Sequence, residues 1–589
     1  MASAITRAFN SGATPVSTTV TVNQPYNPRG KAITVGAIGA QTAFQYFNQN
    51  IAQAVSSGAA SITFPAGNYT ITPESGAQYH ITINSASDLT IDLQGANLTF
   101  AGVQGGLSTG TVQGVVINNG ARIVLKNFTV DYDVRIASSG TVQSESAHCS
   151  GTTHKYVLVN TGQYPITDTR IQQAKIINNS NSTLWGIRAN EYYTYSSPLA
   201  LQGGNGFYPC SAAFDSAFPT VGQTVTVRHF AYDGNAIGVY GSSSQDITLQ
   251  NITLYSAPAM GIYFGSGFTR GAAIQNIKII KNPADSTRLI TLAADGIHFQ
   301  ESSGDLLVEN SEVSFQGDDG LNIVSVLTAS TTVSGTTVTL PNAEAAKFGS
   351  SSGIGQTFAF YGPSFTSLGT AVLGAATVGG STVLTFPGLS GVSSGSWVMN
   401  QSLDTSRVYI SGNSFHDNRE RGLMARATGM MITGNTFSNN SGPAILLLTD
   451  GLSFNEGGFA KDVSILGNTI TSANATQVTS GTYVLEFGAI GTGVECPSAS
   501  GCTNTIAPSS LIQNIAIQNN SITTSAGIGM LLSNLSSAIV TGNTISDAAS
   551  TVQQSSFGGA ASAAGSIHST RSTGLSLGAN SVSRAATSN

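Results

Sequence analysis

Short runs of alternating apolar and polar residues recur from about residue 80, and each is followed by an asparagine and a further apolar pair. Asn251 and Asn276 in this phrase are 25 residues apart, and Asn413 and Asn435 are 22 apart. Such a period is typical of one coil of a β-solenoid. Asparagine tolerates the left-handed backbone of a tight turn, and stacked asparagines can hydrogen-bond to one another. We therefore predict that these asparagines form a structural ladder with no part in chemistry.

A second pattern, in which a glycine precedes two apolar residues separated by one position, accompanies the first. Side chains alternate between the two faces of a strand, so Ile262, Ile297 and Leu321 are predicted to enter the core. The residues between the apolar positions should project outward and stack as one column, consisting of Tyr240, Tyr263, His298, Asn322 and Met424. The column becomes apolar at Leu446 and Leu531, which limits its polar part to the middle coils.

The predicted fold is all-β, a right-handed single-stranded parallel β-helix with an N-terminal helical cap and two inserted β modules. A short amphipathic helix is predicted within residues 40–56, after an irregular segment 1–38, from the helical spacing of Phe44, Phe47, Ile51 and Val55.

The chain is predicted to divide into seven parts. They are an N-terminal region and cap (1–80), first coils (81–133), an inserted module (134–230), central coils with an acidic site (231–324), a second inserted module (325–402), C-terminal coils (403–547) and a Ser/Ala/Gly-rich tail or loose cap (548–589).

Composition narrows the possible functions. Only 9% of the 589 residues are charged, compared with about 25% in a typical soluble domain. The formal charge of −6 includes no long basic run, so we expect no nucleic-acid partner. No stretch approaches the roughly 18 continuous apolar residues of a membrane span, so we expect a soluble protein. The scarcity of Lys and Arg also disfavours a strongly anionic polymer as the substrate.

Four cysteines and the Gly/Ser/Thr/Asn-rich composition suit a secreted or periplasmic protein, although the first residues do not resemble a signal peptide. Of three possible connectivities, we favour disulfides 496–502 and 149–210. The cysteine spacing does not match a zinc site, because no histidine or second cysteine pair stands at ligand distance.

Three carboxylates stand close together in a repeat. The segment Asp295-Gly-Ile-His-Phe aligns with Asp319-Gly-Leu-Asn-Ile at an offset of 24 residues, and Asp318 directly precedes the second copy. Since paired strands lie about 4.8 Å apart, acids on consecutive coils should influence one another and raise at least one pKa. An acid kept protonated beside an ionised one is the equipment of glycoside hydrolysis. We predict Asp295, Asp318 and Asp319 as catalytic residues, with carboxyls about 6.5–9.5 Å apart around a water. A calcium site or a turn-capping pair is the alternative.

Further residues at the same end of the coils are predicted to bind substrate. His298 and Asn322 follow the acids in the outward column, and Tyr263 offers a ring for stacking against a sugar. Arg419 and Arg421 would bind hydroxyls or keep an aspartate ionised, or else form a structural ion pair with Glu420. The remaining candidates, Asp450 and Glu456, follow the next coil. No cofactor is expected.

Several ordered segments together resemble glycoside hydrolase family 110, the α-1,3-galactosidases among the pectate-lyase-like parallel β-helix hydrolases. These segments, which lie mostly within residues 120–455, are Asn127-Phe-Thr-Val-Asp-Tyr-Asp133, Ser256-Ala-Pro-Ala-Met-Gly-Ile262, Ala294-Asp-Gly-Ile-His-Phe299, Asp318-Asp319 with Asn322-Ile323, Asn418-Arg-Glu-Arg-Gly422 and Gly442-Pro-Ala-Ile445 with Asp450. The resemblance implies removal of terminal α-1,3-linked galactose from glycans or polysaccharides with inversion of configuration, no metal, and the three aspartates as the acid/base set. Gly317 and Val324-Ser325 depart from the family pattern.

The sequence is also compatible with other functions. The α-1,3-glucanases of family 87 are similar in their spaced acids. Polygalacturonases have a similar trio, but their Gly-His-Gly and Arg-x-Lys motifs are missing downstream of it. A polysaccharide lyase would need a basic cluster that this chain lacks, and a glycan-binding solenoid without catalysis is the remaining alternative.

Overall fold

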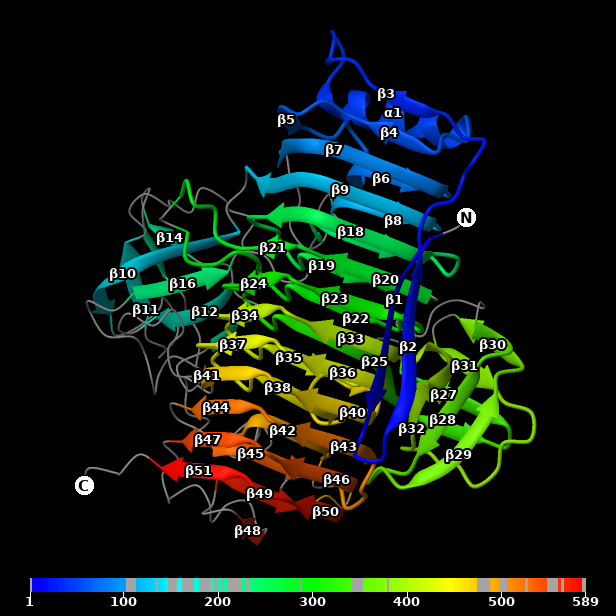
Figure 1. Cartoon of the computed structure of the whole chain (residues 1–589), viewed down its shortest axis with the longest axis vertical. Helices are drawn as coiled ribbons and strands as arrows, with labels where there is room; N and C mark the ends of the chain where they lie inside the picture. The colour runs from blue at the N-terminus through cyan, green and yellow to red at the C-terminus, as the bar shows by residue number, and fades with distance from the viewer. Residues whose placement is uncertain are drawn as a thin grey trace.

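Consecutive coils of the chain stack along one axis in the computed structural model, and the colour gradient of Figure 1 follows that axis from the N-terminal to the C-terminal coils. Equivalent strands of neighbouring coils pair in parallel, with Tyr263 opposite His298 and His298 opposite Asn322. The column predicted from the glycine-containing pattern is therefore present in the predicted register, but its members His298, Asn322 and Met424 are buried, so the prediction of an exposed column holds only for Tyr240 and Tyr263, which are half-buried. The all-β, parallel β-helix architecture is confirmed.

The structure describes residues 3–101, 113–133, 136, 234–265, 267, 270–285, 288–341, 353–378, 381–473, 488–497, 500, 502, 506–524, 528–547 and 566–584. Within residues 137–228 and at residues 560–562 it describes only the course of strands.

Each coil contributes strands to three parallel sheets. The first sheet is formed in chain order by β6 (Tyr79–Asn84), β8 (Gln113–Asn118), β17 (Ile237–Tyr240), β19 (Ile262–Phe264), β22 (Ile297–Gln300), β25 (Leu321–Ala329), β35 (Leu423–Ala425), β38 (Ile445–Asp450), β42 (Gly488–Glu495), β45 (Ile528–Ser533) and β49 (Ile567–Thr570), with β48 (Ala560–Ser562) antiparallel to β49. The second is formed by β3 (Ala32–Thr34), β4 (Ser61–Thr63), β7 (Ser87–Phe100), β9 (Ala121–Tyr132), β18 (Gln245–Leu254), β20 (Arg270–Gln275), β23 (Leu306–Glu309), β33 (Ser406–Ser411), β36 (Thr428–Thr433), β40 (Lys461–Leu466), β43 (Ile512–Gln518), β46 (Leu535–Thr541) and β50 (Thr573–Leu577). The long strands β7, β9 and β18 continue into the third sheet, which adds β5 (Asn68–Ile71), β21 (Lys278–Ile279), β24 (Glu312–Ser314), β34 (Ser414–His416), β37 (Thr436–Ser438), β41 (Thr469–Ala473), β44 (Ser521–Thr524), β47 (Thr544–Asp547) and β51 (Ser581–Arg584).

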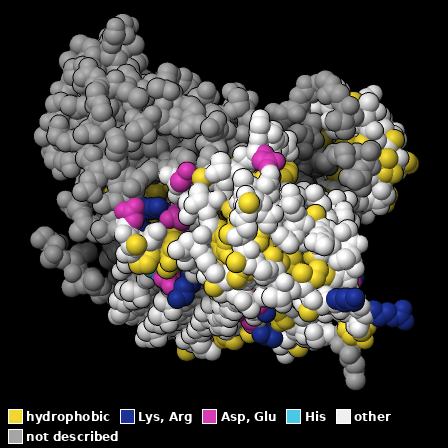
Figure 2. Space-filling model, turned by 90° about the horizontal axis from the view of Figure 1, so that it is seen from above, with side chains coloured by type: hydrophobic (Ala, Val, Ile, Leu, Met, Phe, Trp, Pro, Cys, Tyr) yellow, Lys and Arg dark blue, Asp and Glu magenta, His cyan; other side chains and the backbone are white. Residues whose placement is uncertain are grey.

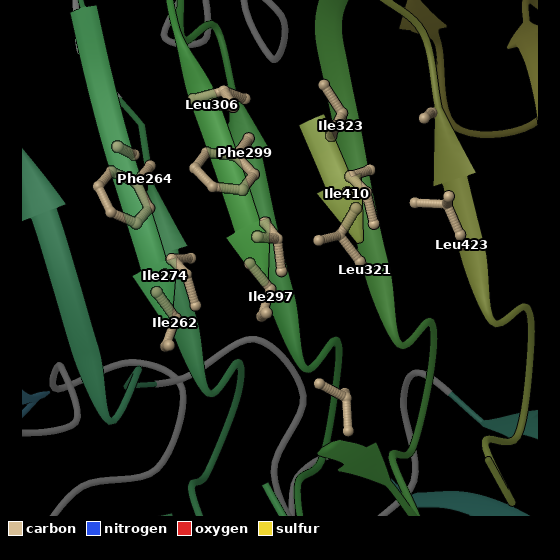
Figure 3. Packing of buried hydrophobic residues seen from close by; sticks show 14 of the residues in the cluster. Ile262, Phe264, Ile274, Ile297, Phe299, Leu306, Leu321, Ile323, Ile410 and Leu423 are labelled. Atoms are coloured by element: carbon tan, nitrogen blue, oxygen red, sulfur yellow. The ribbon is translucent and has the colours of Figure 1, made fainter. Parts of the chain in front are cut away.

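The interior of the stack is filled by columns of like side chains. Figure 3 shows Ile262, Ile297 and Leu321 side by side on adjacent strands, as the alternation predicts, and all three are fully buried. Beside them, the rings of Phe264 and Phe299 stack with centroids 4.8 Å apart. Burial of such side chains stabilises by about 1.5–3 kcal/mol each, so the repeated pattern supplies the main driving force for folding.

The predicted asparagine ladder is confirmed. In the C-terminal coils, the side-chain amide of each buried asparagine donates to the side-chain oxygen of the next at 2.9–3.0 Å, along Asn413, Asn435, Asn468, Asn520, Asn543 and Asn580. An exposed ladder of Asn127, Asn251 and Asn276 has φ values of 63°, 54° and 54°, so these residues adopt the left-handed turn conformation expected for asparagine.

A helix lies at the N-terminal end of the stack. Helix α1 (Ala43–Ser56) begins at Thr42, whose side chain accepts from the amide of Gln45 in a capping box. Tyr46, Phe47 and Ile51 are its buried face, and the helix packs against β4, β5 and β6. The amphipathic helix predicted within residues 40–56 is confirmed.

The interpretation of residues 1–38 as irregular was wrong. Strands β1 (Ala4–Ser11) and β2 (Val16–Asn23) form an antiparallel hairpin that lies along the outside of the coils (Figure 1). Val20 and Val22 pack against Ala273 and Leu307 of the second sheet. The alternation in this segment therefore buries one face on coils about 250 to 290 residues away in sequence, and such a partner cannot be recognised from local sequence.

Two further groups of strands follow β9 and β25 in the chain. Strands β10 (Ala137–Ser146), β11 (Tyr156–Asn160), β12 (Ala174–Asn179), β13 (Tyr192–Thr194), β14 (Ala200–Gln202), β15 (Gly206–Tyr208) and β16 (Thr224–Arg228) form a separate antiparallel sheet. Strands β26 (Thr332–Ser334), β27 (Thr337–Leu340), β30 (Ala375–Val378) and β31 (Thr382–Thr385) form another, and β28 (Thr357–Tyr361), β29 (Ser367–Val372) and β32 (Trp397–Asn400) pair onward from β25. Strand β25 runs through the predicted boundary at residue 324 and joins this group directly to the first sheet.

One of the two predicted disulfides joins Cys496 to Cys502. The predicted 149–210 pair lies outside the described residues. Among the described residues, no helix is long and apolar enough to cross a membrane.

Candidate active site

The three aspartates predicted as catalytic lie together at the start of two neighbouring strands of the first sheet. Asp295 precedes β22, and Asp318 and Asp319 precede β25. The backbone amide of Asp319 donates to Oδ1 of Asp295 at 3.1 Å. One carboxylate oxygen from each residue lies within 4.8 Å of the other two. The contact inferred from the 24-residue offset is therefore present.

One oxygen from each carboxyl lies within 4.8 Å of the other two, which is closer than the predicted separation of about 6.5–9.5 Å between the carboxyls. That range describes two acids facing each other across a bound sugar. Here the acids stand on consecutive coils of one sheet, and the coil spacing of about 4.8 Å limits their distance. A water can still lie between two of these oxygens, because two hydrogen bonds of about 2.5–3.0 Å span such a gap when they meet at an obtuse angle.

Glycine is required beside these acids because neighbouring coils approach closely. A Cβ on Gly296 would lie 2.6 Å from the carbonyl oxygen of Gly320, and one on Gly320 would lie 2.5 Å from that of Gly422. Any side chain there would force the coils apart. The Asp-Gly pairs that mark the repeat thus fix the distance between the carboxylates.

Burial dominates the electrostatics of the cluster. Burial raises the pKa of Asp319 to about 7; Arg421 opposes this shift, while Asp295 and Asp318 add to it. The pKa of Asp295 is also raised, first by burial and then by Asp318, although His298 opposes the rise. The Asp318 side chain is the most accessible of the three, 13% exposed compared with 6% for Asp295 and 3% for Asp319.

His298 links the acid cluster to the outward column. Its Nδ1 lies 2.6 Å from Oδ2 of Asp295, and its ring stacks on that of Tyr263 with centroids 5.6 Å apart and an interplanar angle of 23°. On the other side of Tyr263 lies Tyr240, with ring centroids 5.5 Å apart. The Tyr263 hydroxyl donates to Gln300 at 3.0 Å. Both faces of the Tyr263 ring therefore have protein neighbours.

The two predicted arginines lie behind the acids. Arg419 donates to Oδ1 of Asp318 at 3.1 Å and to the carbonyl of Gly317 at 2.6 Å. The amide of Arg421 donates to Oδ1 of Asp319 at 3.0 Å, and its guanidinium contacts the same oxygen at 3.4 Å. Glu420 also pairs with both arginines, at 2.5 and 3.8 Å. Of the three roles left open by the sequence, pairing with the acids and pairing with Glu420 are both present, and the burial of both arginines disfavours the third, contact with substrate hydroxyls.

Arg426, which was not predicted from the sequence, organises the next part of the site. This fully buried side chain donates to Oδ1 of Asn322 at 3.0 Å and to Oε2 of Glu456 at 2.7 Å. It also donates to the carbonyl of Leu448. Its position five residues after Arg421 follows no repeat, so only the paired strands β25 and β35 bring it to Asn322.

Asp450 and Glu456 have different surroundings. The buried carboxylate of Asp450 accepts from the backbone amides of Leu452, Ser453 and Phe454 at 2.7, 2.8 and 3.1 Å. It therefore fixes the loop that follows β38. Glu456, at the start of β39 (Glu456–Gly457), is partly exposed and reaches the cleft described below.

A cleft of about 530 Å³ begins at His298 and follows the outward column towards the N-terminal coils. Its walls also include the β25 segment 324–326 and the loop residues Phe454, Asn455 and Glu456. Polar contacts come from Gln113, Asn235 and Gln300, and none of the described residues that line it is a Lys or Arg. Seen from the N-terminal end of the stack, the described surface is likewise mostly uncharged, with only scattered Lys, Arg, Asp and Glu side chains (Figure 2). The cleft thus offers hydrogen-bonding groups and aromatic rings, the surface that neutral sugars require.

The three clustered oxygens are also close enough to bind a cation, the alternative left open by the sequence. The donor set favours proton chemistry, however. Two of the carboxylates are paired with Arg419 and Arg421, and the third lies at hydrogen-bonding distance from a histidine nitrogen. These neighbours already compensate the negative charge that a divalent cation would need.

The chain is similar in sequence to known glycosidases. It is 25% identical over 417 residues to the α-1,3-galactosidase B of Bacteroides thetaiotaomicron, an alignment that covers 66% of this chain and 64% of that protein. It is 23% identical over 304 residues to an α-1,3-galactosidase A of Bacteroides fragilis, covering 45% of this chain and 46% of the relative. The chain thus spans less than two thirds of the length of these curated relatives. The resemblance to α-1,3-galactosidases inferred from its motifs is confirmed.

No protein-family profile matches the chain. Among solved structures, the catalytic domain of a GH87 α-1,3-glucanase in complex with tetrasaccharides aligns with 94% of this chain and 70% of its own, at 13% identity and a TM-score of 0.35. The A-module of a mannuronan C-5 epimerase from Azotobacter vinelandii aligns with 93% of each chain at 10% identity and a TM-score of 0.29.

Proposed function

We propose that this protein is an inverting glycoside hydrolase that removes terminal α-1,3-linked galactose from glycans or polysaccharides. The observation that carries the proposal is the contact of three carboxylates on consecutive coils, two of them buried with raised pKa values. Such a set can hold a proton and a general base side by side near neutral pH. The sugar and its linkage are taken from the relatives named α-1,3-galactosidase.

In this proposal Asp318 is the proton donor. Its side chain is the most accessible of the three, so it can reach the glycosidic oxygen. Its partner Arg419 also pairs with Glu420, which lies closer at 2.5 Å. Asp295 and Asp319 hold a water between them. As Asp318 protonates the leaving oxygen, the water attacks the anomeric carbon from the opposite face and gives its proton to this pair.

Replacement of each aspartate by Asn tests the assignment. We expect release of galactose from an α-1,3-linked galactosyl disaccharide to fall by about 10²-fold or more in each variant, because a positioned acid or base contributes roughly 10²–10⁴-fold. Asp462→Asn in β40 is the matched control and should keep the wild-type rate. Wild-type rates in all three site variants would refute the proposal. Release of glucose from α-1,3-glucan, with no galactose from any galactoside, would assign the glucanase alternative instead.

Two further measurements test the inversion of configuration and the assignment of Asp318 as the proton donor. If inversion holds, proton NMR of the early reaction should show β-galactose before mutarotation. With a dinitrophenyl α-galactoside, whose leaving group needs no protonation, Asp318→Asn should recover most of its activity while Asp295→Asn and Asp319→Asn should not. Recovery in Asp319→Asn instead would make that residue the donor.

The surroundings of the site fit this role. We propose that the β-helix is right-handed, that α1 caps its first coil, and that the two inserted modules wall the acidic coils. We also propose that the protein acts outside the cytoplasm as a secreted or periplasmic enzyme on oligo- or polysaccharides. The Cys496–Cys502 disulfide supports an oxidising compartment.

A further inference from the structure

Among the described residues that line the cleft beside the acid cluster, Phe454 offers an aromatic ring that is available for stacking. Phe454 is 45% exposed, whereas Tyr240 and Tyr263 are half-buried in the outward column. The Tyr263 ring lies between the rings of Tyr240 and His298, so its faces are already used. The hydroxyls of both tyrosines are also engaged, Tyr240 with Gln113 at 2.6 Å and Tyr263 with Gln300 at 3.0 Å. The column therefore presents ring edges to a ligand, and the sugar-stacking role predicted for Tyr263 suits Phe454 better.

Phe454 is held in place from below. The Asp450 carboxylate accepts three consecutive loop amides, including that of Phe454 itself at 3.1 Å. The loop then enters β39, which pairs with β25 through Val326 and Glu456. An exposed phenylalanine costs free energy in water unless something covers it, and this one stands on a fixed loop at the wall of a cleft. A preorganised ring of this kind is suited to bind the apolar face of a pyranose.

The charges around the cleft restrict the ligand further. Glu456 is the one carboxylate among its described lining residues, and its Oε2 is paired with Arg426 at 2.7 Å. With no Lys or Arg among its described lining residues, the cleft lacks the side chains that usually pair with a uronate or sulfate group. Apart from Glu456 and His298, its polar side chains carry amides and hydroxyls, which match the hydroxyls of a neutral sugar.

We propose that this cleft binds a neutral pyranose on the leaving-group side of the cleaved bond, and that Phe454 stacks on that sugar and determines specificity for it. The proposal rests on the proposed function, because an enzyme that removes a terminal sugar has further sugars only on the leaving-group side. The cleft meets the acid cluster at His298, and the acids themselves do not line it. The reacting galactose therefore lies at the acids and the next sugar lies in the cleft.

The test compares two substrates that differ only in the leaving group. An α-1,3-linked galactosyl disaccharide places a sugar in the cleft, whereas α-galactosyl fluoride places none. We expect Phe454→Ala to lower kcat/KM on the disaccharide by roughly 3- to 10-fold, as loss of an aromatic contact implies, mainly through KM. The value on the fluoride should not change. Phe454→Trp should retain the disaccharide activity, and Ile354→Ala, which truncates a 52% exposed side chain of the inserted module, is the control.

Equal losses on both substrates would overturn the proposal and place the reacting galactose in the cleft. No loss on either would show that Phe454 does not touch the substrate. If the wild-type protein hydrolyses neither compound, the proposed function fails, and calorimetric titration with the disaccharide decides the inference separately. Weaker binding to Phe454→Ala than to the wild type would uphold the cleft as a sugar site, and no binding to the wild type would overturn it.

Discussion

Replacement of Arg421 by Gln should move the pH dependence of catalysis in a defined direction. Burial raises the pKa of Asp319 to about 7, and the Arg421 guanidinium, 3.4 Å from Oδ1, is the largest opposing influence. In the proposed mechanism Asp319 belongs to the general base, so activity is lost as the pH falls through its pKa. Without the guanidinium the charged carboxylate is less stable, and the acidic limb of the profile should move to higher pH.

The size of this pH shift can be estimated from the distance between the Arg421 guanidinium and the Asp319 carboxylate. Two unit charges 3.4 Å apart interact by about 5 kcal/mol at an effective dielectric constant of about 20, or roughly 3.5 pH units at 1.36 kcal/mol each. This is an upper bound, since Glu420 already shares the Arg421 charge at 3.8 Å and the backbone amide of residue 421 keeps its bond to Asp319. We therefore expect a shift of about one to two pH units.

The assay is kcat/KM for the galactosyl disaccharide from about pH 4 to pH 9. Arg421→Lys, which keeps the positive charge, is the matched control and should shift the acidic limb much less than Gln. Thermal unfolding at each pH separates loss of activity from loss of the fold. A stationary acidic limb, or one that moves to lower pH, would refute the electrostatic reasoning. Movement of a basic limb instead would show that Asp319 donates the proton.

Three further predictions concern stability. Asn435→Ala removes a buried rung of the ladder and should lower the free energy of unfolding by about 2–4 kcal/mol in urea titrations, because the buried asparagines on both sides lose a hydrogen bond. Asn276→Ala, in the exposed ladder, is the control and should lower the free energy of unfolding by less than about 1 kcal/mol. Glu301 is buried without a hydrogen-bond partner for Oε1, and burial raises its pKa from 4.5 to about 8. Because the unfolded chain releases this proton at lower pH than the folded protein does, the free energy of unfolding should fall as the pH rises from 4.5 to 8. Glu301→Gln should remove most of this decline, and a variant with the same pH profile of the melting temperature as the wild type would contradict the prediction. Reduction of the Cys496–Cys502 disulfide should cost about 2 kcal/mol, as a short loop implies, and Cys496→Ser with Cys502→Ser should make stability insensitive to dithiothreitol.

The repeats determined much of this protein. A period of 22 to 25 residues with a fixed asparagine defines the coil, since each coil must return to the same place for its apolar side chains to stack. The aligned Asp-Gly pairs placed Asp295 beside Asp319 because equivalent residues of consecutive coils are neighbours. Helix α1 was predictable from its own periodicity. In each case the signal lies within one or two coils of sequence.

Tertiary structure alone decided the rest. The N-terminal hairpin could not be predicted, because Val20 and Val22 pack on strands whose identity depends on how many coils intervene. Asp295 and Asp319 lie close together because they occupy equivalent positions on paired strands, so the spacing of the sheet sets their distance. Phe454 has no repeat partner, and its place at the cleft depends on the Asp450 loop and on the pairing of β39 with β25. Local sequence fixes what repeats from coil to coil, whereas the walls of the cleft come from segments that meet only once the coils have stacked.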